Sequence, residues 1–495
     1  MPRVLRSVDA SSRSSPPAFV KPRASEIPRF DTLPTWSIIL PIMGKTKIVL
    51  IGAGSASFGV STVADFFQQR KEFWGSTLVL CDVNEAKLKR VKRLAERMND
   101  ATGKPFCIES VTDYRRALEG AGFVFVSVEV DRLERWKLDW EIPFKYGIKH
   151  VLGENGGPGG LSHALRTVPL VLGIARAMEK SAPDAYLINY VNPLSRVCLG
   201  VTRYTKIKTI GICHQINKGF SLVGQVLGLT LHDVQGRQPM THDHFSEADV
   251  VREIKTQIDI KQAGLNHVTW IQDLRDKKTG RDLYPEFRAR LEKMDASWEP
   301  LSRRLYHAFG LFPATGDGHV GEYFSFAHET SDLRGYDFEE RARESLELDA
   351  RVEIAGQDGA PLDEFLQHES GERGIDVAAA ILNNLNQYEL NVNVVNNGAV
   401  SGLPDWAIVE VPAVVSGAGV MPLRVPALPN VITAMLHQQV MIQDRVVEAA
   451  VHGDRQAALQ ALLLDPLVSS YDAAEGVLEA LLETHKEYLP SFLRG

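Results

Sequence analysis

The sequence predicts an α/β fold, with an N-terminal doubly wound parallel sheet and a C-terminal α+β lobe. Two observations lead to this fold class. Between residues 45 and 212, short apolar runs alternate with helical patterns, which is typical of parallel strands buried on both faces. Beyond residue 213 the alternation stops, and longer helical stretches mix with isolated β-like pieces. A chain of 495 residues is long enough for two such units.

The first 42 residues differ in composition from the rest. Seven Ser and seven Pro make up one third of them, and six Lys or Arg accompany three Asp or Glu. Such a segment cannot bury enough apolar area to order itself, so we expect residues 1–42 to be a disordered tail or an upstream extension. The many prolines oppose the amphipathic helix of a targeting peptide, which favours Met43 as the natural start.

The elements of the parallel sheet follow in order. A short apolar run from residue 45 ends in glycines, as expected of a buried strand that leads into a helix, here residues 55–69. A second run at residues 77–81 ends in Asp82, and a helical pattern with basic residues follows at 84–101. A helix is expected at 164–180. Further strands are expected at residues 123–130, 185–190 and 209–212.

The C-terminal part has longer helices and fewer strands. Helices are expected at residues 298–312, 376–385, 431–450 and 473–488, with a β-like piece at 407–411. We therefore expect a nucleotide-binding domain at residues 43–215 and an α+β substrate and metal domain at residues 216–495.

Charge and composition exclude several classes of partner. The formal net charge is −7 and no dense basic run occurs, so nucleic acid is not an expected partner. No apolar run reaches the roughly 20 residues that span a bilayer, so no membrane association is expected. The four cysteines, at 81, 107, 198 and 213, show no paired spacing. Such sparse usage indicates reduced thiols and a cytoplasmic location.

A glycine-rich turn follows the first predicted strand. Gly52, Gly54 and Ser55 stand where that strand opens into a helix, which is the context of a dinucleotide fingerprint. The turn admits a pyrophosphate, and the helix N-terminus offers unpaired N–H groups to its charge. Asp82, at the end of the second strand, can hydrogen-bond a ribose 2′-OH and repel a 2′-phosphate, so NAD is the expected cofactor of this Rossmann-like domain.

Several further blocks occur in a recognisable order. They are residues 139–147, 153–160, 189–193, 211–214, 264–270, 316–323, 393–398 and 403–412. Together they resemble glycoside hydrolase family 4, the NAD- and metal-dependent glycosidases, across nearly all of residues 45–475. The resemblance is greatest to the branch of α-galacturonidases and α-glucosidases, and it implies the architecture of lactate and malate dehydrogenases. This family is an exception to the rule that glycosidases use two carboxylates.

The resemblance also implies a metal site. Cys213 follows a predicted strand at the sheet edge where ligands of such folds collect, and a thiolate with an imidazole can hold a divalent transition metal. By spacing alone a core Cys and a hydrogen-bonded His would be the better interpretation. The family pattern instead identifies Cys213 and His267 as ligands of Mn²⁺ or another divalent metal. The segment between Cys213 and His267 is longer than expected for the family, around residues 234–251. His242 and His244 of this segment are expected in a solvated loop.

The remaining site residues are assigned by the same resemblance. Asp139 matches the general acid, and a carboxyl beside aromatic residues is expected to keep a raised pKa. Asn155, Asn192 and His214 are expected at the sugar, where amides pair with adjacent hydroxyls. The C2 base of several members is a tyrosine, and here the base is expected to be either Asp317 or His319.

The implied reaction is hydrolysis through transient oxidation. Bound NAD takes hydride from C3 of the sugar, a base removes the C2 proton, the aglycone leaves C1, water adds, and hydride returns. The expected substrates are α-glycosides or α-galacturonides, and the expected assembly is a homodimer or homotetramer. The alternative is an NAD-dependent dehydrogenase of a sugar or 2-hydroxy acid, which would produce NADH. A third hypothesis is a noncatalytic NAD- or sugar-binding sensor.

Overall fold

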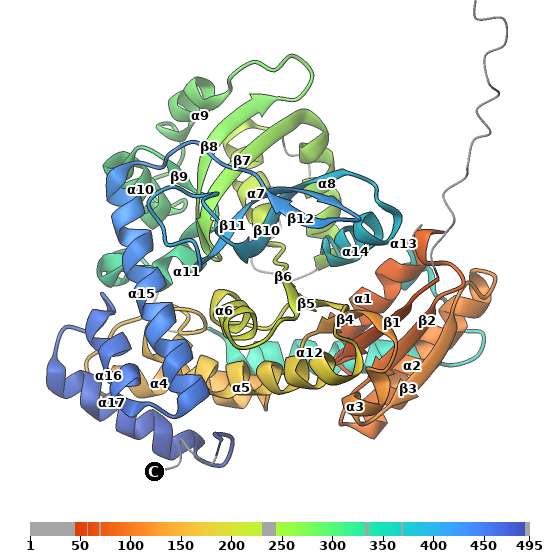
Figure 1. The fold of residues 1–495 in the computed structure, drawn as a ribbon. Helices are drawn as coiled ribbons and strands as arrows, with labels where there is room; N and C mark the ends of the chain where they lie inside the picture. The colour runs from red at the N-terminus through yellow and green to blue at the C-terminus, as the bar shows by residue number, and fades with distance from the viewer. Residues whose placement is uncertain are drawn as a thin grey trace, which may run out of the picture. The chain divides into compact units, whose positions relative to one another are not determined.

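The computed structural model describes residues 45–56, 58–68, 71–229, 244–331, 336–367 and 370–490, with side chains omitted at 244–249 (Figure 1). The expected tail and most of the expected insertion at 234–251 lie outside these residues. Residues 43–495 form one compact unit. The expected boundary near residue 215 falls four residues after strand β6, at the start of helix α7, and the sheet continues beyond it.

Six parallel strands form the first half of the sheet, in the order β3-β2-β1-β4-β5-β6. They are β1 (Lys47–Ile51), β2 (Thr77–Cys81), β3 (Cys107–Val111), β4 (Ala121–Val126), β5 (Tyr186–Asn189) and β6 (Lys208–Gly211). The strand order reverses direction between β1 and β4. Such a switch point opens a crevice at the carboxyl ends of the strands, where ligands of doubly wound folds bind.

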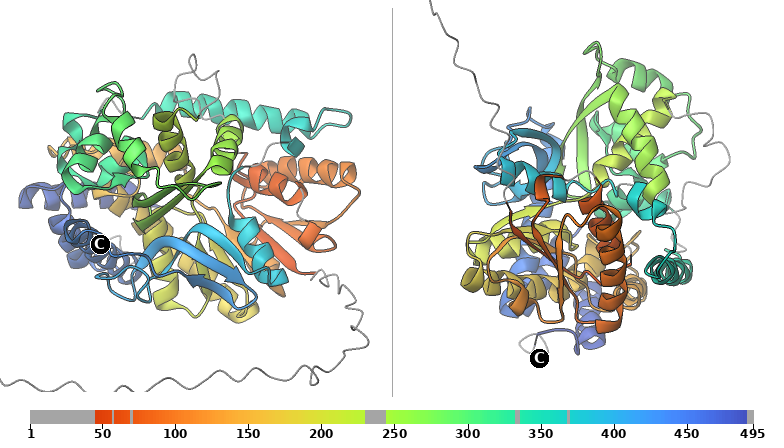
Figure 2. Two further views of the ribbon diagram at one scale, coloured as in Figure 1. Left: turned by 90° about the horizontal axis from the view of Figure 1, so that it is seen from above. Right: turned by 90° about the vertical axis from the view of Figure 1, so that its right-hand side faces the viewer.

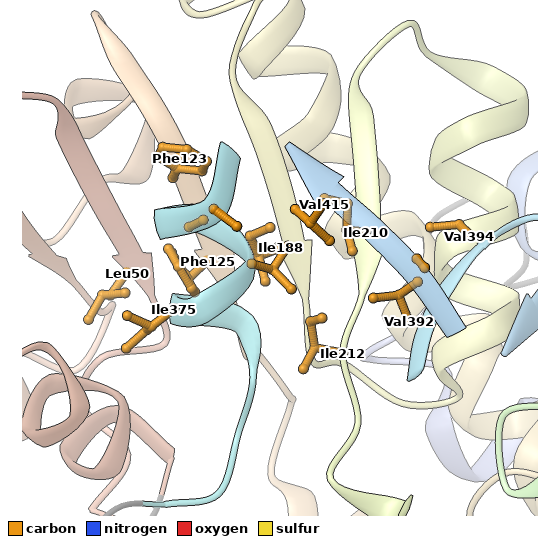
Figure 3. Close-up of a cluster of buried hydrophobic side chains, with 14 of the residues drawn as sticks. Leu50, Phe123, Phe125, Ile188, Ile210, Ile212, Ile375, Val392, Val394 and Val415 are labelled. Carbon is orange, nitrogen blue, oxygen red and sulfur yellow. The ribbon is translucent and has the colours of Figure 1, made fainter. Parts of the chain in front are cut away.

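The two faces of these strands belong to two different cores, because side chains alternate along a strand. Ile48 and Leu50 of β1 pack in one hydrophobic cluster, whereas Val49 and Ile51 pack in another. Helices α1 (Phe58–Phe67), α2 (Glu85–Ala101) and α14 (Gly374–Asn383) contribute to the first cluster. In that cluster Ile375 of α14 points toward side chains of β1, β4 and β5 (Figure 3).

The second face is covered by long helices. They are α4 (Arg132–Phe144), α5 (Gly157–Ser181) and α6 (Leu194–Tyr204), with α3 (Tyr114–Ala117) between β3 and β4. The C-terminal helices α15 (Asn430–His452), α16 (Arg455–Leu464) and α17 (Tyr471–His485) pack in the same core. In the right-hand view of Figure 2 the C-terminal helices, in dark blue, lie below the antiparallel strands, in green and light blue. Several helix starts are fixed by side-chain caps, as where Asn84 accepts the backbone N–H of Lys87 at 3.0 Å.

The second half of the sheet is antiparallel. Strand β10 (Gln387–Val395) pairs with β6 through Asn393 and Gly211, which joins the two halves. The order then runs β10-β11-β7-β8-β9, with β12 (Gly419–Pro422) on β11. The bounds are β11 (Ile408–Ser416), β7 (Ile258–Leu265), β8 (Val268–Asp276) and β9 (Phe312–Pro313).

Five helices lie around this half: α7 (Gln215–Leu227), α8 (His244–Gln257), α9 (Tyr284–Leu291), α10 (Pro300–Phe309) and α11 (Gly316–Val320). Helix α12 (Phe338–Ala355) instead packs against α2 and α4, and α13 (Asp363–Gln367) packs against α1. None of the helices in the described part of the chain combines the length and the apolar character that a bilayer crossing requires.

The structure confirms the predicted fold class and refines the element bounds. The helix expected at 164–180 begins earlier, at Gly157, so the second half of the glycine-rich block is the first turn of α5. Pro158 stands in that first turn, where its missing N–H costs nothing. The helix expected at 298–312 ends earlier, because Gly310 adopts a left-handed conformation and Phe312 starts β9.

Candidate active site

The glycine-rich turn after β1 is shaped by close backbone contacts. Gly52 has φ +92°, and a Cβ built there would lie 1.9 Å from the carbonyl oxygen of Ser127 after β4. A Cβ on Gly59 would lie 2.1 Å from the carbonyl oxygen of Ala53, so Gly59 supplies the close helix–strand packing of the third fingerprint glycine. Both positions therefore exclude a side chain.

Asp82 and Ser55 complete this turn. The Gly54 N–H donates to Asp82 Oδ2 at 2.9 Å, and the Asn84 N–H donates to Asp82 Oδ1 at 2.8 Å. The Ser55 hydroxyl accepts the Phe58 N–H at 3.3 Å and thereby caps α1. The four sequence-predicted nucleotide residues thus lie together. The turn fits a pyrophosphate, because only glycine fits at its crowded positions and α1 begins directly behind it.

Replacing Gly54 by alanine is expected to weaken NAD⁺ binding by about tenfold, the effect of roughly 1.4 kcal/mol. The new Cβ would lie 2.7 Å from the Asp82 carboxyl carbon and would push that side chain from its place. Titration calorimetry measures the change. Gly173→Ala is the matched control, because no described atom lies within 4 Å of its Cβ and alanine favours the helix interior. Equal NAD⁺ affinity in the two variants would contradict this role of the turn.

A thiol and an imidazole meet beyond the end of β6. Cys213 Sγ lies 3.4 Å from His267 Nε2. Cys213 follows β6 by two residues, and His267 lies in the two-residue turn between β7 and β8. The φ of His267 is +66°, a conformation that costs free energy in a residue with a Cβ and that often occurs at functional sites. The structure therefore brings the two predicted metal ligands together, although 54 residues separate them in sequence.

His319 and Glu322 extend this pair. The His319 ring centroid lies 4.3 Å from that of His267. Ligand atoms of His267, His319 and Glu322 all lie within 4.8 Å of one another. His319 comes from α11, and Glu322 from the short 3₁₀ helix that follows. We call the group Cys213, His267 and His319 the Cys–His cluster.

Within the Cys–His cluster His267 is buried, Cys213 and His319 are half-buried, and all three groups are neutral in the protein alone. Burial raises the pKa of the Cys213 thiol well above its usual value, and the nearby Glu410 and Glu372 raise it further. Burial lowers the pKa of His267 well below its usual value, and burial also lowers the pKa of His319. Among the described residues, nothing hydrogen-bonds the Nδ1 atoms of these two histidines. Neutral imidazoles beside a thiol are a fitting donor set for a divalent transition metal, whose charge would favour the thiolate.

Two of the predicted sugar-binding residues, Asn155 and Asn192, lie around a second carboxylate, Glu154. The Asn192 amide donates to Glu154 Oε1 at 3.3 Å, and the Asn155 amide donates to Glu154 Oε2 at 3.3 Å. The Asn155 N–H donates to Glu322 Oε1 at 2.9 Å. The buried Asn155 Oδ1 has no hydrogen-bond partner in the described part of the chain. These polar atoms therefore border the Cys–His cluster through Glu322.

His214 has a different environment from the two asparagines. Its side chain is half exposed, and Nδ1 lies 2.6 Å from Glu372 Oε1. This contact holds the side chain of the residue that follows Cys213. The charge of His214 acts on both His267 and His319, so the ring lies on the side of the Cys–His cluster.

Asp317 and His319, the two alternatives for the base, are clearly separated by their contacts. Asp317 Oδ2 accepts the Leu301 N–H at 2.8 Å, and Oδ1 accepts the Ser302 N–H at 2.7 Å. Its carboxylate thus caps the first turn of α10. Of Asp317 and His319, only His319 lies beside His267.

Asp139 differs from the sequence prediction. It is 1% exposed, and its Oδ1 lies 2.9 Å from His485 Nε2 while its Oδ2 lies 2.5 Å from Arg166 Nη2. Although burial alone would raise the pKa of Asp139, the Arg166 charge and the hydrogen bonds lower it to about 2. The expected raised pKa is wrong, because the carboxyl is an ionised partner in an ion pair that joins α4, α5 and α17. A carboxylate in this state has no proton to donate at neutral pH.

Sequence reasoning missed four glutamates of this region. Glu322 stands three residues after His319, a spacing that would place both on one helical face. Glu154 stands inside the glycine-rich block, where it could have been singled out. The sequence positions of Glu372 and Glu410 do not indicate that they lie near Cys213, because a distant loop and a distant strand bring them there. Burial and the nearby Glu154 raise the pKa of Glu322 to about 8.

Comparisons with known proteins identify the family of the chain. A family model described as "Family 4 glycosyl hydrolase" matches residues 47–229, and the model of its C-terminal domain matches residues 262–468. An α-glucosidase of Erwinia rhapontici is 32% identical and covers 90% of this chain and 99% of its own length. An α-galacturonidase of Thermoanaerobacterium saccharolyticum is 28% identical, and the alignment covers 89% of this chain and 96% of that protein.

Solved structures show the same fold. The crystal structure of a putative glucosidase, lplD, of Bacillus subtilis has a TM-score of 0.75 at 26% identity and covers 88% of this chain and 100% of that chain. A 6-phospho-α-glucosidase from gut microorganisms, in complex with NAD and Mn²⁺, has a TM-score of 0.74 at 22% identity, with 90% and 99% covered. At that identity the second likeness concerns the fold alone.

Proposed function

The chain belongs to family 4 of the glycosyl hydrolases, and from this premise we propose that it hydrolyses α-glycosides or α-galacturonides with bound NAD and a divalent metal such as Mn²⁺. Family membership decides for a glycosidase over an NAD-dependent dehydrogenase of a sugar or 2-hydroxy acid. The observation that carries the proposal is the Cys–His cluster, which lies beyond β6 in the same sheet as the glycine-rich turn.

The residues divide into those that hold cofactors and those that face the sugar. Gly52, Gly54, Ser55 and Asp82 would hold the dinucleotide, and Cys213 with His267 would hold the metal. When bound, NAD supplies reversible hydride acceptance at the sugar, and the divalent cation supplies Lewis acidity at its oxygens. Burial of His267 and partial burial of Cys213 and His319 limit their contact with water, which strengthens the charge interactions among them.

We assign proton abstraction at C2 to His319 in preference to Asp317. Burial keeps His319 neutral, so its imidazole can accept a proton at neutral pH. Both oxygens of Asp317 are already occupied by backbone N–H groups of α10. Asn155, Asn192 and His214 would orient the sugar, since each presents a polar group beside the cluster.

A C2-deuterated 4-nitrophenyl α-glycoside is expected to lose its label to water while nitrophenol is released. Proton removal at C2 exchanges the label with solvent, whereas simple displacement at C1 leaves the C2–H bond intact. The assay contains NAD⁺, Mn²⁺ and a thiol reductant, and mass spectrometry of the released sugar measures the label. A panel of gluco-, galacto- and galacturono-configured substrates identifies the sugar.

Two results would overturn this proposal. Full retention of deuterium in the hydrolysed sugar would exclude abstraction at C2. Stoichiometric accumulation of NADH would indicate net oxidation and favour a dehydrogenase. Omission of NAD⁺ and Mn²⁺ from stripped enzyme is the control, and it is expected to abolish nitrophenol release.

We also propose that the enzyme works in the cytoplasm as a homodimer or homotetramer. A ligand thiol has to stay reduced, and all four cysteines are free thiols. Exposed apolar side chains on α12, Leu346 at 69% and Ile354 at 57%, support burial against another copy. The molar mass in solution, from light scattering, checks the assembly.

A further inference from the structure

Glu410 is a buried carboxyl group in the middle of the antiparallel half of the sheet. It belongs to β11 and is 0% exposed. In the described part of the chain, no Lys, Arg or His side chain pairs with it. Isolating a carboxyl from water without a positive partner is costly unless hydrogen bonds replace its hydration. The contacts of Glu410 therefore call for an explanation.

Four side-chain amides converge on this carboxyl. Gln262 and Asn391 donate to Oε1 at 3.1 and 3.0 Å. Asn266 and Asn393 donate to Oε2 at 2.9 and 3.3 Å. Burial raises the pKa of Glu410, and the amide hydrogen bonds oppose that rise. Because all four partners donate, the geometry fits an ionised carboxylate with its acceptor capacity filled.

Two of these amides lead to Cys213. The Asn391 side chain also donates to the Cys213 carbonyl oxygen at 3.1 Å, which fixes the backbone of that residue. The Asn266 side chain hydrogen-bonds Cys213. Glu410 therefore holds both amides that touch the cysteine.

The other connections lead to His267. Asn266 immediately precedes His267 in the β7–β8 turn. A second series of hydrogen bonds starts at Gln262 Oε1, which accepts the Thr269 hydroxyl at 3.2 Å. Thr269 Oγ1 in turn accepts the Gln215 amide at 3.0 Å, and Gln215 Oε1 accepts the His267 N–H at 3.1 Å.

We propose that Glu410 is a positioning residue that holds Cys213 and His267 in the geometry required to bind a divalent metal. This inference rests on the proposed metal site and adds a function for the block at residues 403–412. Groups that orient metal ligands from behind typically change metal affinity by about 10- to 100-fold when they are removed. Glu410 differs from the usual case because it acts on both ligands at once, through amides.

Glu410→Gln tests the proposal with little change in volume. If the new amide NH₂ takes the place of Oε2, it faces two donors, the side-chain amides of Asn266 and Asn393. Asn393 can rotate to accept it, because its Oδ1 has no partner among the described residues. Asn266 cannot rotate without giving up its hydrogen bond to Cys213. We expect the Mn²⁺ affinity of the NAD-loaded protein, measured by electron paramagnetic resonance of free Mn²⁺, to fall at least tenfold.

Glu389→Gln is the matched control. Glu389 is also buried, at 1% exposed, and lies on the adjacent strand β10, but its partners are Arg373 and Gln387. Its loss should leave Mn²⁺ affinity within about twofold of wild type. Thr269→Val is the second variant, since it removes only the hydrogen bonds that lead from Gln262 to His267 and keeps the Glu410 carboxylate. It should weaken Mn²⁺ binding several-fold, with the thermal midpoint of each metal-free variant recorded in parallel.

The outcomes separate this inference from the proposed function. If wild type binds Mn²⁺ and Cys213→Ser does not, the metal site stands. Unchanged Mn²⁺ affinity in folded Glu410→Gln, or equal losses in Glu410→Gln and Glu389→Gln, would then overturn the positioning role alone. If Glu410→Gln does not fold, unchanged affinity in Thr269→Val overturns it instead. If wild type and Cys213→Ser bind Mn²⁺ alike, both the site and the positioning role fall.

Discussion

Replacing Cys213 by serine is expected to lower kcat/KM by about a thousandfold or more. A metal acting as a Lewis acid contributes several kcal/mol to transition-state stabilisation, and about 4 kcal/mol corresponds to about a thousandfold in rate. The serine hydroxyl keeps the shape of the side chain but does not ionise to form a comparable ligand. Steady-state kinetics with a nitrophenyl glycoside measures the loss, at both low and saturating Mn²⁺.

Two controls make this result specific. NAD⁺ affinity should stay within about twofold of wild type, because Cys213 lies outside the glycine-rich turn. Cys107→Ser removes an exposed thiol of β3 far along the sheet from the site and should leave activity unchanged. Activity of Cys213→Ser near that of wild type would exclude Cys213 as a metal ligand.

Replacing Asp139 by asparagine is expected to destabilise the fold by about 3–5 kcal/mol, the usual cost of breaking a buried ion pair. The change leaves the Arg166 guanidinium, which is 4% exposed, without its carboxylate partner. It also weakens the attachment of α17, whose His485 is bound to Asp139. Denaturant unfolding measures the loss. Asp100→Asn, in a surface pair with Lys104, is the control and should cost less than about 1 kcal/mol.

The same pair predicts how stability depends on pH. The folded-state pKa of Asp139 is about 2, below the ordinary value of 3.8. A lowered pKa contributes stability that is present above the unfolded value and is lost as the pH falls through the folded value. Wild type should therefore lose this contribution between about pH 4 and pH 2, whereas the asparagine variant has none to lose.

The Asp139 variant also decides between a structural and a catalytic role. At a temperature where the variant stays folded, we expect kcat for an alkyl glycoside to remain within a few-fold of wild type. A general acid would behave differently, because its loss slows substrates with poor leaving groups far more than nitrophenyl glycosides. A large, leaving-group-dependent loss in folded protein would restore the catalytic assignment.

The sequence was informative where chemistry depends on local spacing. The glycine-rich turn and Asp82 could be predicted because strand, turn and helix are consecutive in the chain. Cys213 and His267 needed the family pattern, since spacing alone does not show that a hairpin 54 residues later returns to β6. The pKa of Asp139 was misjudged because the fold brings its partners Arg166 and His485 from two other helices. Glu410 could not be found, because its role arises from four amides on two strands and one turn.

The pairing of Gly211 on β6 with Asn393 on β10 has a consequence for engineering. One continuous sheet carries the dinucleotide turn and both proposed metal ligands, so their spacing does not depend on closure between two lobes. A hybrid that combines residues 45–215 with the C-terminal half of a relative would have to preserve this single antiparallel junction. A shift of one residue there would turn Asn393 to the opposite face of the sheet and move His267 and Glu410 away from Cys213, which stays with the dinucleotide turn in the N-terminal half.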